Sequence, residues 1–480
     1  YSLPLGQGTL TALMGTTFQG SDNAATNLSA SGFTSDALLR NPQAASIVTV
    51  ESVTQSEYQY SAMFGRINYN WKGKYLANLT GRRDASSRFG PGKQFANFGA
   101  IGAAWVFSEE PWLQNNILSF GKIRASIGTT GSDQIADYGY VDLCTSTSYT
   151  YDGTGGLYPL NLANPNYAWE ENRKWEVALE AGLWKDRLNL SVSYYNHRSG
   201  NQLVGVPMPG ITGFFNVQAN LPAEVKNTGV EVVLSSSPIE TKNFTWTTSV
   251  NITFPRNELV SFPDIENSTF AFDYIVGKPL TVQPSFEYTR VNPETGVYEH
   301  RDVNEDGGLT FEGDLLGNKS VAQKFFGGFQ NTFRYKSLSL DIFFQFVNQI
   351  GRNYLFYFYD RPGAATNQPL WVLDRWQNPG DSAPIGQFTQ GFGNAFLGNL
   401  FNSYSDNRFS DASFIRLKNI SLSFQFPSAW LKKTGLQQAR LYAQGQNLAT
   451  ITNYQGLDPE NQSATLPPLR MITLGASITF

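Results

Sequence analysis

The chain has 480 residues, a length that suits one large barrel or several ordinary domains better than one small domain. It carries 35 basic and 39 acidic residues, a net charge of −4, which argues against a strongly basic nucleic-acid-binding protein. Only 15% of the residues are charged and 14% are aromatic, unlike the composition of a disordered chain. One cysteine, Cys144, excludes an intrachain disulfide framework, and two histidines, His197 and His300, leave little room for histidine-based metal or triad chemistry. We therefore do not expect an enzyme.

The sequence predicts no transmembrane helix, because it contains no run of about 18 apolar residues. Residues 1–30 hold no charged segment followed by an apolar core, and the chain starts at Tyr1 rather than at a methionine. We therefore expect it to be part of a longer protein. Low charge with many aromatic residues fits a membrane β-barrel, whose strands are only half apolar.

Apolar and polar residues alternate along many segments, as they do in a sheet with two unlike faces. In residues 173–184 the odd positions from Trp175 to Leu183 are apolar, whereas the even positions include Glu176 and Glu180. The same period of two is found in residues 188–195, 244–254, 338–346 and 471–480. A soluble propeller or sandwich would also alternate in this way.

Strand length and loop pattern favour an outer-membrane barrel over those soluble folds. The alternating segments run to about ten residues, the length of a tilted strand that crosses a bilayer. Aromatic residues such as Trp71, Trp105 and Trp184 cluster near their ends, as in interfacial girdles. Tight turns occur at 71–75, 184–187 and 335–338, and long connections at 131–172, 199–225, 291–325, 349–410 and 449–469. Short turns at one end and long loops at the other are typical of outer-membrane barrels, with the long loops outside the cell and the short turns in the periplasm.

We predict about fifteen antiparallel transmembrane strands. Thirteen are expected at 58–71, 74–84, 95–107, 120–130, 173–184, 187–198, 226–236, 244–254, 326–335, 338–348, 411–426, 438–448 and 470–480. Alternation of strand direction leads us to expect two more within residues 256–290. Residues 1–57 are then predicted to be an extracellular loop region, and residues 58–480 to be the strands and loops of the barrel.

Several motifs resemble the SusC/RagA family of TonB-dependent transporters, and they occur in the family's order over most of residues 58–480. They are found at 64–75, 83–91, 113–131, 164–170, 226–231, 414–422 and 446–459. Members of this family, known from the Bacteroidetes, are barrels of about 22 strands filled by an N-terminal plug. The resemblance implies that this chain is the C-terminal part of such a barrel, and that the plug, the TonB-binding segment and the first strands are absent from this sequence.

The resemblance also implies a function: TonB-dependent import of a large oligomeric nutrient, a glycan or a peptide, across the outer membrane. The implied partners are a SusD-like surface lipoprotein that acts as a lid, the TonB–ExbB–ExbD complex through the absent N-terminal part, and outer-membrane lipid. Two alternatives are a structural scaffold in a larger secretion or assembly complex, and an open porin. No nucleic-acid partner is expected.

The long connection 349–410 is the most distinctive candidate for ligand binding. Its aromatic and basic residues suit stacking on sugar rings or contact with apolar peptide side chains. The candidates are Tyr354, Phe356, Tyr357, Tyr359, Arg361, Trp371 and Trp376. Packing of this loop on its neighbours, or on a partner lid, is an equal alternative. A cluster of charges at Arg82, Arg83, Asp84 and Arg88 near the outer rim also suits a carboxylate or oligosaccharide, although rim charges are usually just solvated.

A second candidate is a calcium loop at Asp302, Asn304 and Asp306, followed by Gly307. The pattern fails at its last position, which is Gly313, with Glu312 one residue early. An acidic turn in an exposed loop is the preferred interpretation. No other cofactor is expected.

Overall fold

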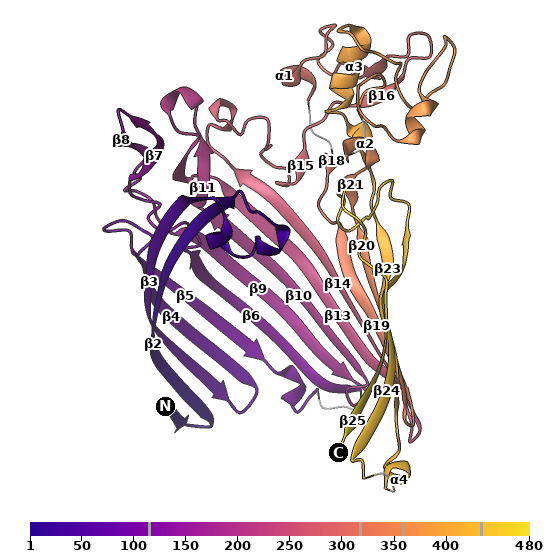
Figure 1. The fold of residues 1–480 in the computed structure, drawn as a ribbon. Coiled ribbons are helices and arrows are strands. Elements are labelled where there is room, and N and C mark those ends of the chain that lie inside the picture. The colour runs from indigo at the N-terminus through magenta and orange to yellow at the C-terminus, as the bar shows by residue number, and fades with distance from the viewer. Residues whose placement is uncertain (114–116, 316–318, 358–359, 433–434) are drawn as a thin grey trace. The chain divides into compact units, whose positions relative to one another are not determined.

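The structure is a computed structural model that describes residues 1–113, 117–315, 319–357, 360–432 and 435–480. Fifteen strands are hydrogen-bonded in one sheet order, and almost every strand neighbours the one that precedes it along the chain (Figure 1). In sheet order they are β1 (Ser2–Leu5), β2 (Gly8–Ser31), β3 (Ile47–Trp71), β4 (Tyr75–Ser86), β5 (Phe95–Trp105), β6 (Leu118–Ser132), β9 (Glu170–Leu183), β10 (Leu188–Gly200), β13 (Glu224–Glu240), β14 (Phe244–Ser261), β19 (Phe325–Tyr335), β20 (Leu338–Asn348), β23 (Phe414–Gln425), β24 (Gln438–Thr452) and β25 (Met471–Thr479). The predicted all-β, antiparallel architecture is confirmed.

The other described elements lie in the connections between these strands. Five small hairpins or strand pairs are β7 (Leu143–Tyr151) with β8 (Thr154–Asn161), β11 (Gln202–Pro207) with β12 (Asn216–Leu221), β15 (Val282–Gln283) with β18 (Lys319–Ser320), β16 (Tyr288–Val291) with β17 (Tyr298–His300), and β21 (Ile350–Arg352) with β22 (Phe409–Asp411). The α-helices are α1 (Phe311–Asp314), α2 (Tyr354–Tyr357), α3 (Asn394–Asn402) and α4 (Ser428–Leu431). Short 3₁₀ turns are η1 (Asp36–Leu38), η2 (Pro42–Ala44), η3 (Phe107–Glu109), η4 (Gly210–Thr212), η5 (Ile265–Asn267), η6 (Leu370–Asp374) and η7 (Asp406–Arg408). Within the described ranges, no helix has the length and hydropathy needed to cross a membrane.

Two compact units can be distinguished by their internal contacts. The first comprises Tyr1–Trp105, Ala125–Trp175 and His197–Glu224, and the second comprises Val106–Arg124, Glu176–Asn196 and Val225–Phe480. In the first unit, β1 to β5 form a continuous run of hairpins. In the second, β19, β20, β23, β24 and β25 do the same, and α1, α3 and β16 lie beyond the loop ends of β20 and β23 (Figure 1).

Short and long connections alternate along the sheet, as the sequence predicted. A two-residue turn joins β1 to β2, and tight turns close the β3–β4, β9–β10 and β19–β20 hairpins. The β9–β10 turn is made by Trp184, Lys185 and Asp186, all with positive φ. At the other end of the sheet, longer loops join each hairpin to the next. The largest of these loops follow β14 and β20.

The structure differs from the sequence-based expectation at two places. Residues 1–57, expected to be a loop, hold β1, β2 and the first half of β3. Residues 256–290, expected to hold two strands of the sheet, do not, because β14 runs on to Ser261 and then pairs directly with β19. A strand that runs up at 244–254 and one that runs down at 326–335 already alternate in direction, so the parity argument for two extra strands was wrong. The total of fifteen is nevertheless reached, because β1 and β2 replace them.

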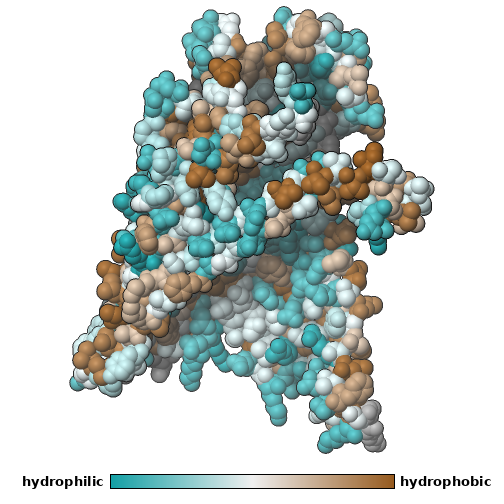
Figure 2. Space-filling model, turned by 60° about the vertical axis from the view of Figure 1, so that its left-hand side comes forward, coloured by the Kyte–Doolittle hydropathy of each residue, from teal (hydrophilic) through white to brown (hydrophobic). Residues whose placement is uncertain are grey.

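The sheet has two unlike faces, which is clearest in β9. Trp175, Val177 and Leu179 are exposed, whereas Glu176 and Glu180 on the other face are partly covered. Large apolar side chains are exposed in the same alternating manner on most of the other strands, so hydrophobic residues lie at the surface beside hydrophilic ones (Figure 2). Apolar side chains on an exposed sheet face are costly in water, and are expected of a face that meets lipid.

Candidate functional site

The aromatic candidates of the β20–β23 connection do not gather in one site. Tyr354 and Trp371 form a ring pair with centroids 4.6 Å apart. Trp376 instead donates its indole N–H to the carbonyl oxygen of Pro293 at 2.7 Å, and so packs on the β16–β17 hairpin. Arg361 lies over the ring of Phe396 at 5.2 Å. Tyr359 lies outside the described residues.

Phe356 lies between two guanidinium groups. Arg352 and Arg408 each have their central carbon 4.3 Å from the centre of its ring, and Tyr357 packs on its edge. Arg408 also donates to the carbonyl oxygens of Leu355 and Phe356. Burial, together with the neighbouring Arg352, lowers the pKa of Arg408. These contacts therefore hold the start of the long loop against its end. The two guanidinium groups bind partners within the loop itself.

The aromatic candidates are half-buried, and a different set of residues forms the exposed apolar surface of this loop. Phe392 is 93% exposed and Leu370 is 83% exposed. Further exposed members are Leu373, Phe388, Leu397, Leu400 and Tyr404. We call these seven residues the loop apolar surface. The sequence contains a signal for it, because Leu397, Leu400 and Tyr404 follow a helical spacing of three and four, but a strand-based interpretation passes over it.

Helix α3 explains why one side of that segment is exposed. Gly398, Asn399 and Asn402 are buried. A Cβ atom added to Gly398 would lie 2.8 Å from Val297 and 3.2 Å from the backbone nitrogen of Tyr298, so only glycine permits this approach. The buried side of α3 thus rests on β17, and its leucines point away.

The acidic loop at 302–314 is closed by its own hydrogen bonds. The carboxylate of Asp302 accepts the backbone N–H groups of Glu305 and Gly307, both at 2.8 Å. Asp314, which is buried, accepts the N–H groups of Val303 and Thr310, and these backbone hydrogen bonds lower its pKa. Asn304 donates to Asp306 at 2.9 Å, whereas Glu312 is exposed. No cluster of three or more metal-ligating side chains occurs among the described residues, and Asp314 rather than Glu312 completes the loop.

His300 is the second distinctive group near this loop. Its ring lies 6.2 Å from the rings of Phe286 and Tyr288 and 6.4 Å from that of Phe401. Both ring nitrogens are buried, and neither has a hydrogen-bond partner among the described residues. Burial in this apolar surrounding lowers the pKa of His300 to about 4, partly opposed by the charge of Asp406. The side chain is therefore neutral at pH 7 and acts as part of an aromatic core.

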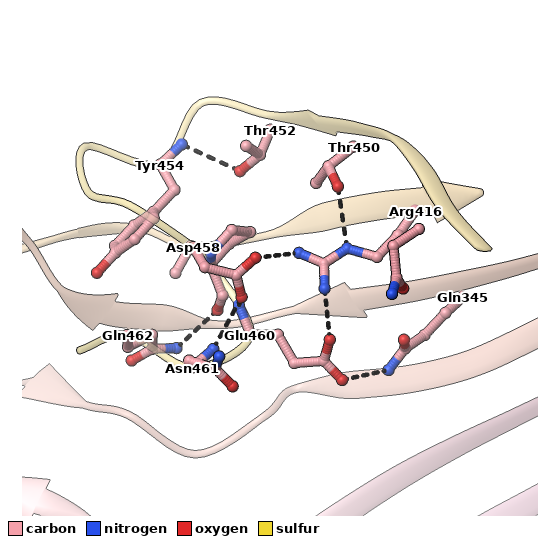
Figure 3. Close-up of polar contacts among 12 residues, drawn as sticks. Gln345, Arg416, Thr450, Thr452, Tyr454, Asp458, Glu460, Asn461 and Gln462 are labelled. Atoms are coloured by element: carbon pink, nitrogen blue, oxygen red, sulfur yellow. Dashed lines mark hydrogen bonds and ion pairs between the residues drawn. The ribbon is translucent and has the colours of Figure 1, made fainter. Parts of the chain in front are cut away.

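A buried ion-pair cluster joins the β24–β25 loop to the sheet (Figure 3). Arg416 of β23 is 2% exposed and pairs with Asp458, which is 3% exposed, and with Glu460 at 2.6 Å. It also donates to the Thr450 hydroxyl at 2.9 Å. Lys418 reaches Glu460 at 2.9 Å. We call Arg416, Asp458 and Glu460 the arginine cluster.

The β24–β25 loop, which the arginine cluster holds, also contacts the beginning of the β20–β23 loop. The side chain of Gln349 donates to the carbonyl oxygen of Pro459 at 2.8 Å. The backbone N–H of Tyr354 donates to the carbonyl oxygen of Gln455 at 2.7 Å. The phenol of Tyr454 donates to the carbonyl oxygen of Arg352. The two motifs at 414–422 and 446–459 that suggested the family therefore meet in space and position the loop that carries the loop apolar surface.

On the second face of β9, acidic and basic side chains form a ladder with β6. Arg124 pairs with both Glu176 and Glu180, the latter at 3.0 Å, and Lys122 reaches Glu180 at 3.4 Å. Two positive charges thus balance two negative ones. This agrees with the prediction that the even positions of this segment form a polar face.

Comparison with known proteins identifies the family. Residues 2–448 match the family model described as TonB dependent receptor-like, beta-barrel. The chain is 29% identical to a TonB-dependent receptor of Formosa agariphila, over 100% of this chain and 51% of that protein. It is also 29% identical to the TonB-dependent receptor SusC of Bacteroides thetaiotaomicron, over 87% of this chain and 43% of that protein.

The fold is also similar to that of solved structures. A chain in the structure of the RagAB peptide transporter matches with a TM-score of 0.86 and 26% identity, over 100% of this chain and 54% of that chain. The chain thus spans about half the length of the relatives it matches. These matches confirm the resemblance drawn from the motifs. The chain belongs to the TonB-dependent receptor-like β-barrel family, whose members are outer-membrane transporters and not enzymes.

Proposed function

We propose that the protein containing this chain imports a large oligomeric nutrient across the outer membrane, and that this import depends on TonB. In this proposal the fifteen strands form part of the barrel wall, with the long loops outside the cell and the short turns in the periplasm. The observation that carries it is the match of the whole chain to the RagAB transporter fold, together with the family match over residues 2–448.

For the substrate class, the proposal is an oligomer, a peptide or a glycan. The RagAB structure is described as a peptide transporter, and this likeness supports a peptide. The loop apolar surface consists mainly of leucine and phenylalanine, which suit apolar contacts better than they suit sugar hydroxyl groups.

The proposed partner is a SusD-like surface lipoprotein that covers the loops as a lid. The loop apolar surface supports this, because seven large apolar side chains exposed on one loop are typical of a contact surface for another protein. The arginine cluster would hold this surface in place. Energy would come from TonB, ExbB and ExbD through the N-terminal part of the protein.

The experiment is uptake of labelled oligopeptides and oligosaccharides by cells that express the full-length protein, with and without TonB. We expect uptake to require both the protein and TonB. Uptake of the same substrate at an unchanged rate without TonB would contradict the proposal, and would instead indicate an open channel.

The lid is tested separately by co-purification of the surface lipoprotein with the full-length receptor. Leu370→Asp combined with Phe392→Asp is expected to reduce co-purification strongly, since it places two charges in the contact. Ile211→Asp is the matched control, because Ile211 is 99% exposed on a different loop. Equal loss in both proteins, or no loss in either, would contradict a lid at the loop apolar surface.

A further inference from the structure

A basic cluster lies on the exposed apolar face of the first compact unit, near the loop ends of its strands. Side chains alternate along a strand, so Arg83 shares the face of Leu79 on β4, and Arg173 shares the face of Trp175 on β9. Lys93 lies in the turn that joins β4 to β5. We call Arg83, Lys93 and Arg173 the rim cluster.

Arg83 is held in place by neutral neighbours. Its guanidinium lies 5.0 Å above the ring of Phe95, which is 58% exposed, and Asn97 stands directly opposite it in the β4–β5 register. In the part of the chain that the structure describes, no carboxylate forms an ion pair with Arg83 or with Lys93. These two cations are thus oriented but not neutralised.

Arg173 is paired only loosely. Its nearest carboxylate oxygen, on Glu171, is 3.9 Å away, and the two side chains are 76% and 67% exposed. A pair this exposed contributes little, so Arg173 can exchange this partner for a stronger anion at small cost. Arg198, by contrast, lies 2.7 Å from Glu224 and is already neutralised.

A cavity of about 520 Å³ is lined by Lys93 and Arg173, and Arg83 stands beside it, opposite the lining residue Asn97 in the β4–β5 register. Its lining also includes Phe95, Asn97, Thr129 and Glu171, the loosely held partner of Arg173. Thr129 is fixed by accepting the backbone N–H of Gly99 at 3.2 Å. β4, β5, β6 and β9 are successive in the sheet, so three strand spacings, about 14 Å in all, separate Arg83 from Arg173.

The height of the rim cluster matches a membrane interface. Arg83 is eight residues from Tyr75, which stands beside Trp71 at the short-turn end of the β3–β4 hairpin. Eight residues span about 26 Å along a strand, or about 20 Å along the membrane normal at a tilt of about 40°. The apolar band of an outer-membrane barrel is about 25 Å tall, so Arg83 and Phe95 lie close to its other edge.

We propose that the rim cluster binds the phosphate groups of lipopolysaccharide in the outer leaflet of the membrane. Arginine and lysine are the usual partners of phosphate, and an aromatic side chain at the interface supports the acyl boundary. A headgroup with two separated phosphates fits two basic positions that stand about 14 Å apart better than one phosphate does. The site rests on the proposed orientation, with the long loops outside the cell, but not on transport itself.

The test measures binding of fluorescent lipopolysaccharide to the purified full-length protein in a zwitterionic detergent. Arg83→Gln combined with Arg173→Gln is expected to raise the Kd at least about tenfold, since it removes two charge-assisted contacts. Arg290→Gln combined with Arg301→Gln is the matched control: it removes the same charge from two exposed loop arginines, and the Kd should stay within about twofold.

Three results would overturn the proposal: an equal Kd in the double variant and the wild type, an equal loss in the control variant, or competition by phosphatidylglycerol vesicles as strong as that by unlabelled lipopolysaccharide. Heat-modifiability on gels establishes that each variant is folded. Arg83→Lys with Arg173→Lys, which keeps both charges, should retain most of the binding even if the glutamine variants fold poorly. The assay contains no TonB, so its failure and that of the import proposal are separate outcomes.

Discussion

Arg416 shows how a single residue can determine the position of a long loop. It is buried and contacts two carboxylates and a threonine hydroxyl, and those carboxylates belong to the connection between the last two strands. Asp458 also accepts the backbone N–H groups of Glu460 and Asn461 at 3.0 and 3.1 Å, so the loop is shaped around the same carboxylate that pairs with Arg416. Loss of Arg416 would leave a buried charge without its partner.

We expect Arg416→Met to open the β24–β25 loop, at a cost of about 3–5 kcal/mol, the usual cost of breaking a buried pair from one side. Hydrogen exchange of residues 453–470 measures this as faster exchange. Arg416→Met combined with Asp458→Asn should recover part of the protection, because it removes both charges. Unchanged exchange in the single variant would show that the cluster does not hold the loop.

His300 predicts a pH dependence of the loop hairpin. Its folded pKa of about 4 is below the ordinary histidine pKa of 6.5, so the unfolded loop binds more protons between these values. Stability contributed by neutral His300 is therefore complete above about pH 6.5, and is lost as the pH falls toward 4. We expect exchange of β16 and β17 to be faster at pH 5 than at pH 7, after correction for the intrinsic rate.

The control for this prediction is His300→Phe. Phenylalanine suits the surrounding rings of Phe286, Tyr288 and Phe401 and has no proton to bind, so the difference between pH 5 and pH 7 should disappear. A pH dependence of the same size in this variant would assign the effect to other groups.

The individual site residues were harder to predict from the sequence than the strands. Trp376 and Phe356 are aromatic and lie in a loop, which suggested ligand binding. Only the fold reveals that Trp376 binds the Pro293 carbonyl and that two arginines pack on Phe356. Asp458 and Arg416 are 42 residues apart in the sequence, and no spacing rule brings them together. Their contact follows from the way the β24–β25 loop folds onto β23, which a single sequence does not specify.

At the scale of elements, alternation was the most informative signal. β9, β20 and β25 were predicted to within a few residues, because large apolar residues mark every second position. β2 was missed because its sequence is dominated by glycine, serine, threonine, alanine and asparagine, a composition shared with loops. A strand with few large apolar side chains shows a weaker alternation of apolar and polar residues.

The two faces of β9 predict opposite results for neighbouring substitutions. Leu179→Arg places a charge on the exposed apolar face, where arginine near the middle of a membrane costs about 2–4 kcal/mol. We expect less folded protein and lost heat-modifiability on gels. Glu180→Gln should assemble normally, because Glu176 still pairs with Arg124. Equal amounts of folded protein for both variants would argue against a lipid-facing side at Leu179.

At the scale of the whole molecule, the barrel proposal requires that one face of every strand meets lipid and that the other does not. It combines the alternation, the exposed apolar residues, the alternating short and long connections and the family match. The rim cluster acquires its proposed role only if this arrangement holds.

The most direct measurement is a nitroxide scan of β9 in the full-length protein, reconstituted in lipid. Cys144 is replaced by serine, since it is exposed and would also be labelled, and residues 175–182 are changed to cysteine and labelled one at a time. We expect a period of two: labels at Val177, Leu179 and Ala181 are relaxed by oxygen, which dissolves in lipid, whereas labels at Glu176 and Glu180 are relaxed by a water-soluble nickel chelate. Accessibility without this period, or with the two sets exchanged, would contradict the assignment of β9 to a membrane-spanning barrel wall.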